Sequence, residues 1–164
     1  MIKIKIYIDI CFINIYYRMR ILMTMAIMFI GSFIIQYLLM SSIMVNNISD
    51  ITNSLGKFYM SIIMGLYMVV VEVMMHDHHY DVFSIKYYAI CAGLLIAFIY
   101  LYRAQQFIND TQYIEGMIEH HSMAILTSNK ILEKTDNYKV AKLAKEILQT
   151  QKDEIIVMKN ILKK

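Results

Sequence analysis

The chain has 164 residues, of which 59% are hydrophobic, and this share is too high for a soluble globular protein of one domain. Its net charge of +3 is small and its Lys and Arg residues form no basic face, so nucleic-acid binding is not expected. The cysteines, Cys11 and Cys91, lie in unrelated segments, which argues against a disulfide framework. Composition therefore predicts a membrane protein that has the lipid bilayer as a partner.

Residues 1–20 are interpreted as a basic N-terminal extension. Their apolar stretch is short and is interrupted by Asp9 and Asn14, so it cannot span a bilayer. No small-residue cleavage site follows it, as a signal peptide would require.

Three apolar stretches then predict a transmembrane region over residues 21–103. About 20 apolar residues are enough to cross the hydrocarbon core. The predicted spans are 21–45, 58–75 and 85–102, and the polar residues between them, 46–57 and 76–84, are the expected loops.

The basic residues predict the orientation of these spans. Four of them precede the first span, whereas the first loop carries only Lys57. The positive-inside rule then places the N-terminus in the cytoplasm. After three crossings, the C-terminal segment is expected to be extracytoplasmic.

Residues 104–164 change from uniformly apolar to amphipathic and predict a helical hairpin. Apolar residues recur at helical spacing from Phe107 to Leu132, and again over residues 138–162, where Lys and Glu occupy the other side. The segment 130–138 contains Thr-Asp-Asn and is the expected break. A hairpin of this length has little core of its own, so we expect it to pair with a second copy or with the membrane helices.

A cluster of methionine and histidine lies in the first helix of this hairpin. Met117 is three residues from His120 and four from His121, and this spacing brings the three side chains to one broad helix face. Imidazole binds copper, zinc, iron and nickel, while thioether sulfur selects Cu(I). The cluster therefore favours copper as the bound metal ion.

The second helix offers further ligands to this cluster if the hairpin is antiparallel. They have the spacing i, i+3, i+7 and share one face: Gln151, Glu154 and Met158. The alternative interpretation is that Glu154 is solvated, that Gln151 borders a packing seam and that Met158 belongs to the core.

The second span carries a separate pattern that would suit a Cu(I) path. Its candidate ligands are Met60, Met64, Met68, Glu72, Met75, His76 and His79. Methionine at helical spacing is also ordinary packing. Glu72 differs, because a carboxylate within a membrane is costly and indicates a function or a buried partner.

No catalytic site is predicted. The sequence has no glycine-rich phosphate loop and no His-Glu-x-x-His zinc motif, and no nucleophile has a recognisable setting.

The segment Tyr113 to Ile125 resembles the DUF305 family, whose motif runs Phe-x-x-x-Met-Ile-Pro-His-His-x-x-Ala; here the centre reads Met117-Ile118-Glu119-His120-His121. Gln151-x-x-Glu154-Ile155-x-x-Met158 is similar to the closing motif of that family. The spans are similar to those of a membrane-anchored bacterial branch. The resemblance starts near Met19, which suggests that residues 1–18 are dispensable or that translation starts at Met19.

The resemblance implies a ferritin-like, extracytoplasmic helical domain that is linked in some members to copper binding and copper resistance. Soluble members often contain two hairpins, so a single one implies a homodimer that completes a four-helix bundle. The chain departs from the family pattern with Glu119 in place of Pro, with Thr127 and Ser128 where Met is frequent, and with Asn137 or Tyr138 in place of a frequent His. These departures weaken the metal prediction.

The sequence thus predicts an all-α protein: three transmembrane helices followed by a hairpin that resembles half of a ferritin-like bundle. The leading functional hypothesis is a copper-binding domain for sequestration or handover of the metal. The alternative is a structural membrane protein whose hairpin mediates oligomerisation without metal. A ferritin-like redox enzyme is disfavoured, because such di-iron sites use Glu-x-x-His and the corresponding pair here is Met117-x-x-His120.

Overall fold

The structure is a computed structural model that describes residues 19–163, and the part of the predicted extension before Met19, with Cys11, lies outside the described residues. Every regular element of the described chain is helical, so the all-α prediction is confirmed. Three of the helices are long and apolar enough to cross a membrane: Met19–Met44, Leu55–Tyr80 and Ile85–Arg103. The chain is thus multi-pass in character, as its composition indicates.

The first of these helices changes its winding before it ends. Residues 19–34 are α-helical, η1 (Ile35–Leu39) is a π-helix, and α2 (Met40–Met44) returns to the α conformation. A π-helical turn holds one more residue than an α-turn and therefore rotates the residues that follow it. The predicted end of this span, at residue 45, agrees closely with the helix end at Met44.

The second span extends further than predicted. Helix α3 (Leu55–Tyr80) continues through His76, which was expected to begin a loop, and α4 (Ile85–Arg103) begins shortly after it. Polar residues do not by themselves break a helix. The chain leaves α3 at Asp81, which has a φ of 50°. The Asp77 carboxylate then accepts hydrogen bonds from the backbone nitrogen and hydroxyl of Ser84, both at 2.7 Å.

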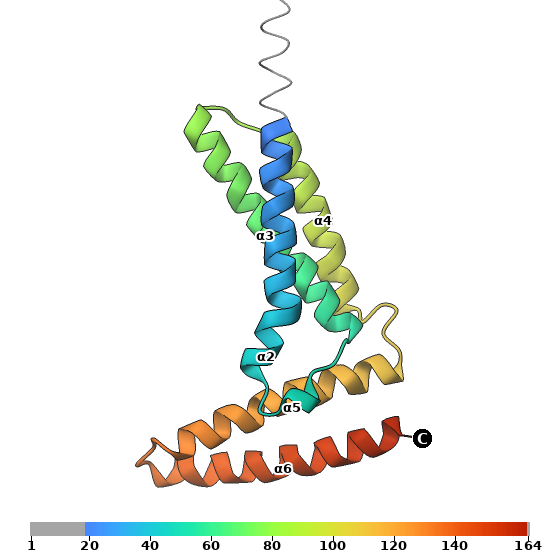
Figure 1. Cartoon of the computed structure of the whole chain (residues 1–164), viewed down its shortest axis with the longest axis vertical. Coiled ribbons are helices and arrows are strands. Elements are labelled where there is room, and N and C mark those ends of the chain that lie inside the picture. The colour runs from blue at the N-terminus through green and yellow to red at the C-terminus, as the bar shows by residue number, and fades with distance from the viewer. Residues whose placement is uncertain (1–18, 164) are drawn as a thin grey trace, which may run out of the picture. The chain divides into compact units, whose positions relative to one another are not determined.

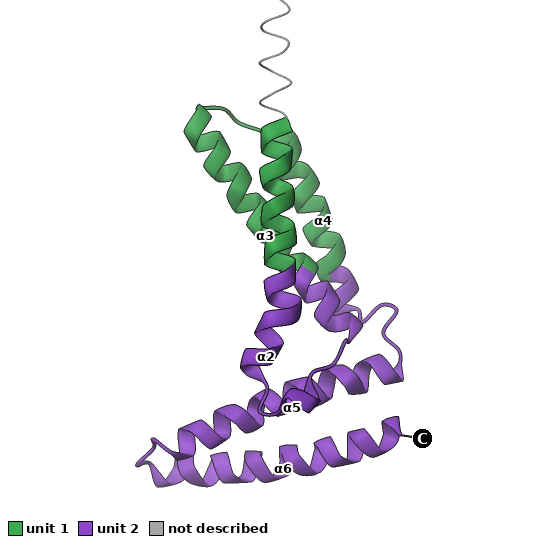
Figure 2. Ribbon diagram, viewed as in Figure 1, with its two compact units in different colours: residues 1–33, 62–99 green, residues 34–61, 100–164 purple. Residues whose placement is uncertain are grey.

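By their contacts the described residues form two compact units, which Figure 2 shows in different colours. One unit comprises residues up to 33 together with 62–99, and the other comprises residues 34–61 together with 100–164. The unit boundaries cut through the spans, whereas the sequence suggested a division at residue 103.

The core of the first unit is a small apolar cluster. Val69, Val73 and Cys91 are buried at its centre, and Phe29 is among the partly buried side chains around them. Gly65 lies directly against Phe29: a Cβ at this glycine would come within 2.8 Å of the ring. The backbone of α3 can approach the first helix this closely only because the residue has no side chain.

The second unit contains the hairpin. Helices α5 (Asp110–Leu132) and α6 (Tyr138–Leu162) run side by side in opposite directions (Figure 1), and the bounds of α6 agree with the prediction. Asparagine caps begin both helices. The Asn109 side chain accepts a hydrogen bond from Gln112 N at 2.9 Å, and Asn137 accepts one from Lys139 N at 2.9 Å.

One part of the predicted pattern for α5 is wrong. Phe107 was included in the helical repeat, but it lies before the helix in the connection from α4, with a φ of 61°, and its side chain is exposed. Gln105 in the same connection has a φ of 50°. A residue with positive φ cannot continue a right-handed helix, so the repeat begins only after Asn109.

Candidate functional site

Four of the six hairpin side chains predicted to bind metal line one cavity between the two helices of the hairpin. It has a volume of about 700 Å³, and the four predicted ligands in its wall are Met117, His121, Glu154 and Met158. The antiparallel arrangement of α5 and α6 brings these two pairs together although they are more than 30 residues apart in the sequence. Residues of the two motifs therefore face each other across the hairpin, as the antiparallel arrangement predicted.

His121 is held at both of its ring nitrogens. Nδ1 lies 2.7 Å from the backbone oxygen of Met117, and Nε2 lies 2.8 Å from a carboxylate oxygen of Glu154. A carbonyl oxygen only accepts hydrogen bonds, so Nδ1 must be the donor there. This contact fixes the ring orientation and directs Nε2 into the cavity, which is how proteins commonly orient a metal-binding histidine.

His120 lies apart from this arrangement. Its side chain is exposed and lines a different cavity, and its ring centroid is 5.9 Å from that of His121. Consecutive residues on an α-helix point about 100° apart, so the paired histidines of the motif face different surroundings. The prediction that both contribute to one site with Met117 therefore does not describe this structure.

Gln151 is also outside the wall of the hairpin cavity. Its amide nitrogen lies 3.4 Å from the Glu154 carboxylate and donates to it. In this position the amide orients the carboxylate, and Glu154 is the group that faces His121.

A buried carboxylate on α5 joins the hairpin to the first loop. Glu119, whose side chain is 7% exposed, accepts hydrogen bonds from the Ser41 hydroxyl, from the backbone nitrogen of Thr52 at 3.1 Å and from the Thr52 hydroxyl at 3.3 Å. Lys57 Nζ lies 3.3 Å from the same carboxylate. A buried charge is stable only when it is paired and hydrogen-bonded in this way.

A second set of polar contacts lies beside the first. The Asp50 carboxylate accepts a hydrogen bond from the Ser122 hydroxyl at 2.7 Å and pairs with Lys159 of α6. The backbone nitrogen of Asn46 donates to Ser122 Oγ at 3.0 Å. Two residues of the motif region, Glu119 and Ser122, therefore attach the hairpin to the loop.

Sequence reasoning missed both of these roles. Glu119 was noted only as a departure from the family pattern, and Ser122 was given no role. The charged residues Asp50 and Lys57 of the predicted first loop were the available signal for these roles. A charged group that becomes buried needs a partner of opposite charge or a hydroxyl group, and Glu119 and Ser122 supply them.

The hairpin residues form no conventional cation site. Within residues 19–163, no group of three or more His, Cys, Asp or Glu side chains lies close enough to hold a metal ion. A metal in the hairpin cavity would therefore need sulfur from Met117 or Met158 in addition to His121 and Glu154. Such a mixed ligand set suits a soft ion.

The candidate ligands of the second span fall into three places. Four of them, Glu72, Met75, His76 and His79, line one cavity of about 290 Å³ together with Arg20. Met64 and Met68 border none of the described cavities, and Met60 lines the same cavity as His120. The predicted continuous path along the helix is therefore divided.

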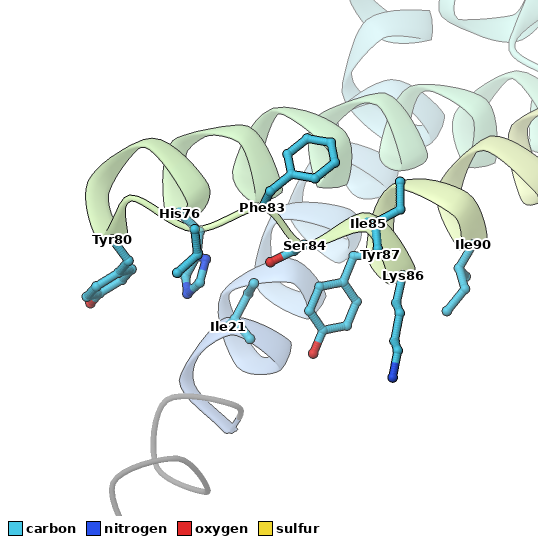
Figure 3. Close-up of a pocket in the computed structure, with 10 residues that line it drawn as sticks. Ile21, His76, Tyr80, Phe83, Ser84, Ile85, Lys86, Tyr87 and Ile90 are labelled. Carbon is cyan, nitrogen blue, oxygen red and sulfur yellow. The ribbon is translucent and has the colours of Figure 1, made fainter.

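A further cavity lies where α3 passes into α4. It has a volume of about 660 Å³, and His76, Tyr80, Lys86 and Tyr87 are its larger polar residues (Figure 3). The other lining residues are mostly apolar, and His76 supplies its single imidazole. This cavity therefore offers a metal ion fewer ligands than the hairpin does.

Comparison with known proteins supports the family resemblance. The family described as a domain of unknown function, DUF305, matches residues 101–164. An uncharacterised protein of Acanthamoeba polyphaga mimivirus is 36% identical over 136 residues, which are 83% of this chain and 89% of that protein. The chain belongs to the DUF305 family. No solved structure matches the chain.

Membership of the DUF305 family confirms the resemblance and places its domain on the hairpin. The matched segment 101–164 contains both α5 and α6, and with them the four residues of the hairpin cavity. The similarity to the mimivirus protein extends beyond this segment, because it covers 83% of the chain. The family description states no activity, and a fold by itself does not imply a function.

Proposed function

We propose that this multi-pass membrane protein binds Cu(I) in its hairpin, for sequestration or handover of the metal. The observation that carries the proposal is the cavity between α5 and α6, which gathers Met117, His121, Glu154 and Met158. The thioether groups favour Cu(I) over harder ions. The predicted extracytoplasmic position of the hairpin is part of the proposal.

The contacts of His121 explain how the site accepts a metal. Nε2 and Glu154 Oε2 are 2.8 Å apart, and the contact is a full hydrogen bond when a proton lies between them. A metal ion takes the place of that proton. Two ligand atoms that each lie ~2.0–2.1 Å from a tetrahedral metal ion are about 3.3 Å from each other. The nitrogen and the oxygen are 2.8 Å apart here, so one of them must move by about half an ångström to bind the ion. Glu154, whose side chain is 49% exposed, has the freedom to do so.

A competition titration of the full chain in detergent tests the proposal. The chain is titrated with Cu(I) under reducing conditions against a chromogenic chelator. Replacing His121 by alanine should lower the affinity of the hairpin site about 100-fold, since it removes a ligand. His78→Ala is the matched control, because His78 is exposed and lines none of the described cavities.

Two further arms of the titration separate copper binding from simple packing. Met158→Leu should weaken Cu(I) binding while helix content remains unchanged, because leucine keeps the volume and removes only the sulfur. Zn(II) should bind more weakly than Cu(I). Equal Cu(I) affinity in the wild type and in His121→Ala would refute a metal site at this position.

A second candidate function, assembly through the hairpin, is favoured by the first half of α6. Apolar residues recur there at a spacing of three or four residues although they are exposed: Val140, Leu143 and Ile147. An exposed apolar stripe of this kind indicates a partner surface. A second copy of the chain could cover it and complete a four-helix bundle.

Cysteine cross-linking tests this assembly. In a chain whose native cysteines are replaced, Ile147→Cys should form a covalent dimer on mild oxidation. Lys152→Cys is the control, because Lys152 lies on the opposite side of α6. Equal cross-linking at both positions, or at neither, would contradict a dimer formed through this face.

A further inference from the structure

A second sulfur-rich cavity lies within the unit that contains the hairpin. Its volume is about 300 Å³, and its wall includes five methionines and one histidine: Met40, Met44, Met60, Met117, Met123 and His120. The first three belong to the membrane-type helices, and the other three belong to α5. Side chains from four separate segments of the chain line this cavity, because α4 and the connection after it add Tyr102 and Ile108.

The ligand candidates of this cavity have room to change conformation. None of the six is fully buried, and Met44 and Met60 are 40% and 41% exposed. The unbranched methionine side chain is flexible and polarizable. Thioethers around a cavity can therefore converge on an ion, and thioether with imidazole is a ligand set for Cu(I).

The backbone beside the cavity is unusual as well. The π-helix η1 (Ile35–Leu39) directly precedes Met40, and its residue Gln36 also lines the cavity. One additional residue in a helical turn rotates all later residues by about 100°, so this stretch determines which way Met40 and Met44 face. Short π-helical stretches of this kind occur frequently at functional sites.

The charges near the cavity are already balanced. The two charged groups among its lining residues, Lys57 and Glu119, are paired with each other at 3.3 Å. The thioether and imidazole ligands are neutral. The cavity thus suits an ion of low charge that accepts sulfur, and it has no free carboxylate that would favour a harder ion such as Zn(II) or Ca²⁺.

We infer that this cavity is a second Cu(I) site, and that Met117 connects it to the first. Met117 lines both this cavity and the hairpin cavity, so its sulfur can serve either site. An ion would move between the sites by exchange of ligands. It would leave His121, Glu154 and Met158 and keep Met117. It would gain His120 and the methionines of the spans. No electron is transferred, and copper remains Cu(I). This inference rests on the proposed function of the hairpin.

Stoichiometry tests the second site in the full chain. Cu(I) is titrated under reducing conditions into the protein in detergent or nanodiscs. The wild type should bind about two ions per chain, and replacing the three span methionines by leucine should reduce this to about one. The triple variant is Met40→Leu, Met44→Leu and Met60→Leu. Leucine preserves the volume, and circular dichroism verifies the helix content.

Two companion variants make the outcomes distinguishable. The matched control replaces two other exposed methionines, which line none of the described cavities: Met23 and Met74. This control should bind copper like the wild type. The hairpin variant, Glu154→Gln with Met158→Leu, removes ligands of the first site only and should also retain about one ion.

The inference is overturned if the triple variant binds as much Cu(I) as the wild type, or if the control loses as much as the triple variant. In the first case the hairpin site, and with it the proposed function, can still stand. If the triple variant loses one ion and the hairpin variant loses none, the second site is supported and the proposed hairpin site fails. X-ray absorption of the copper-loaded hairpin variant should show mainly sulfur ligands, and a spectrum dominated by oxygen would also contradict the inference.

Discussion

Replacing Glu119 by alanine should release the first loop from the hairpin. This carboxylate accepts hydrogen bonds from the Ser41 hydroxyl and from both the backbone nitrogen and the hydroxyl of Thr52, and it pairs with Lys57. Alanine removes the acceptor of all of these contacts at once. The loop would then have to leave the hairpin or remain with unsatisfied polar groups.

The burial of the pair determines the size of the effect. The side chains of Lys57 and Glu119 are only 12% and 7% exposed, so solvent screens their interaction weakly. Removing one partner of a buried ion pair typically costs about 3–5 kcal/mol, since the other charge stays behind unpaired. Glu119→Gln keeps the shape and some of the hydrogen bonds, so about 1.5–3 kcal/mol is expected for it.

Hydrogen exchange measures this change at the affected backbone. The Thr52 amide donates to Glu119, so its protection reports opening of the loop. A loss of about 3 kcal/mol corresponds to roughly a 100-fold faster exchange, because each ~1.4 kcal/mol is a factor of ten. The Asn46 amide, which donates to Ser122, should exchange faster as well if the loop opens as a unit.

Glu133→Ala provides the matched control. Glu133 forms an ion pair with Lys130 at 2.8 Å, but both side chains are more than half exposed, at 56% and 59%. An exposed pair of this kind contributes at most about 0.5 kcal/mol. If the Thr52 amide exchanges at the same rate in Glu119→Ala as in Glu133→Ala, the buried carboxylate does not hold the loop.

Two other expectations concern helix packing and the orientation in the membrane. Gly65→Ala should lower stability by about 1–3 kcal/mol, because its Cβ would meet the Phe29 ring. Gly93→Ala should not, because the space around Gly93 is open, and thermal unfolding in detergent compares the two variants. A reporter fused to the C-terminus should appear on the non-cytoplasmic side, because basic residues precede the first span, and a cytoplasmic signal would reverse the proposed orientation.

Local sequence patterns were sufficient for most of the helices. The second hairpin helix was predicted over residues 138–162, and α6 has these bounds. The three membrane-type helices were also predicted, because a continuous apolar stretch is a property of neighbouring residues. The meeting of Glu154 with the Met and His cluster could be anticipated from the antiparallel register alone.

Contacts between distant residues decided the rest. Helix α3 continues to Tyr80 and ends where Asp77 binds Ser84 at the start of α4, a contact between residues seven positions apart that the local apolar pattern does not reveal. The π-helical winding before Met40 had no signature in the composition.

The role of each motif residue depended on which partner faces it in the folded chain. His120 and His121 are adjacent in the sequence, yet the helix turns them toward different cavities. Glu119 binds Ser41, which is 78 residues away, and only the packing of α2 against α5 brings the two together. The sequence by itself therefore determined the helices and the candidate ligands, because these depend on local periodicity and residue chemistry. The tertiary structure alone decided which of them share a cavity, since that depends on long-range packing.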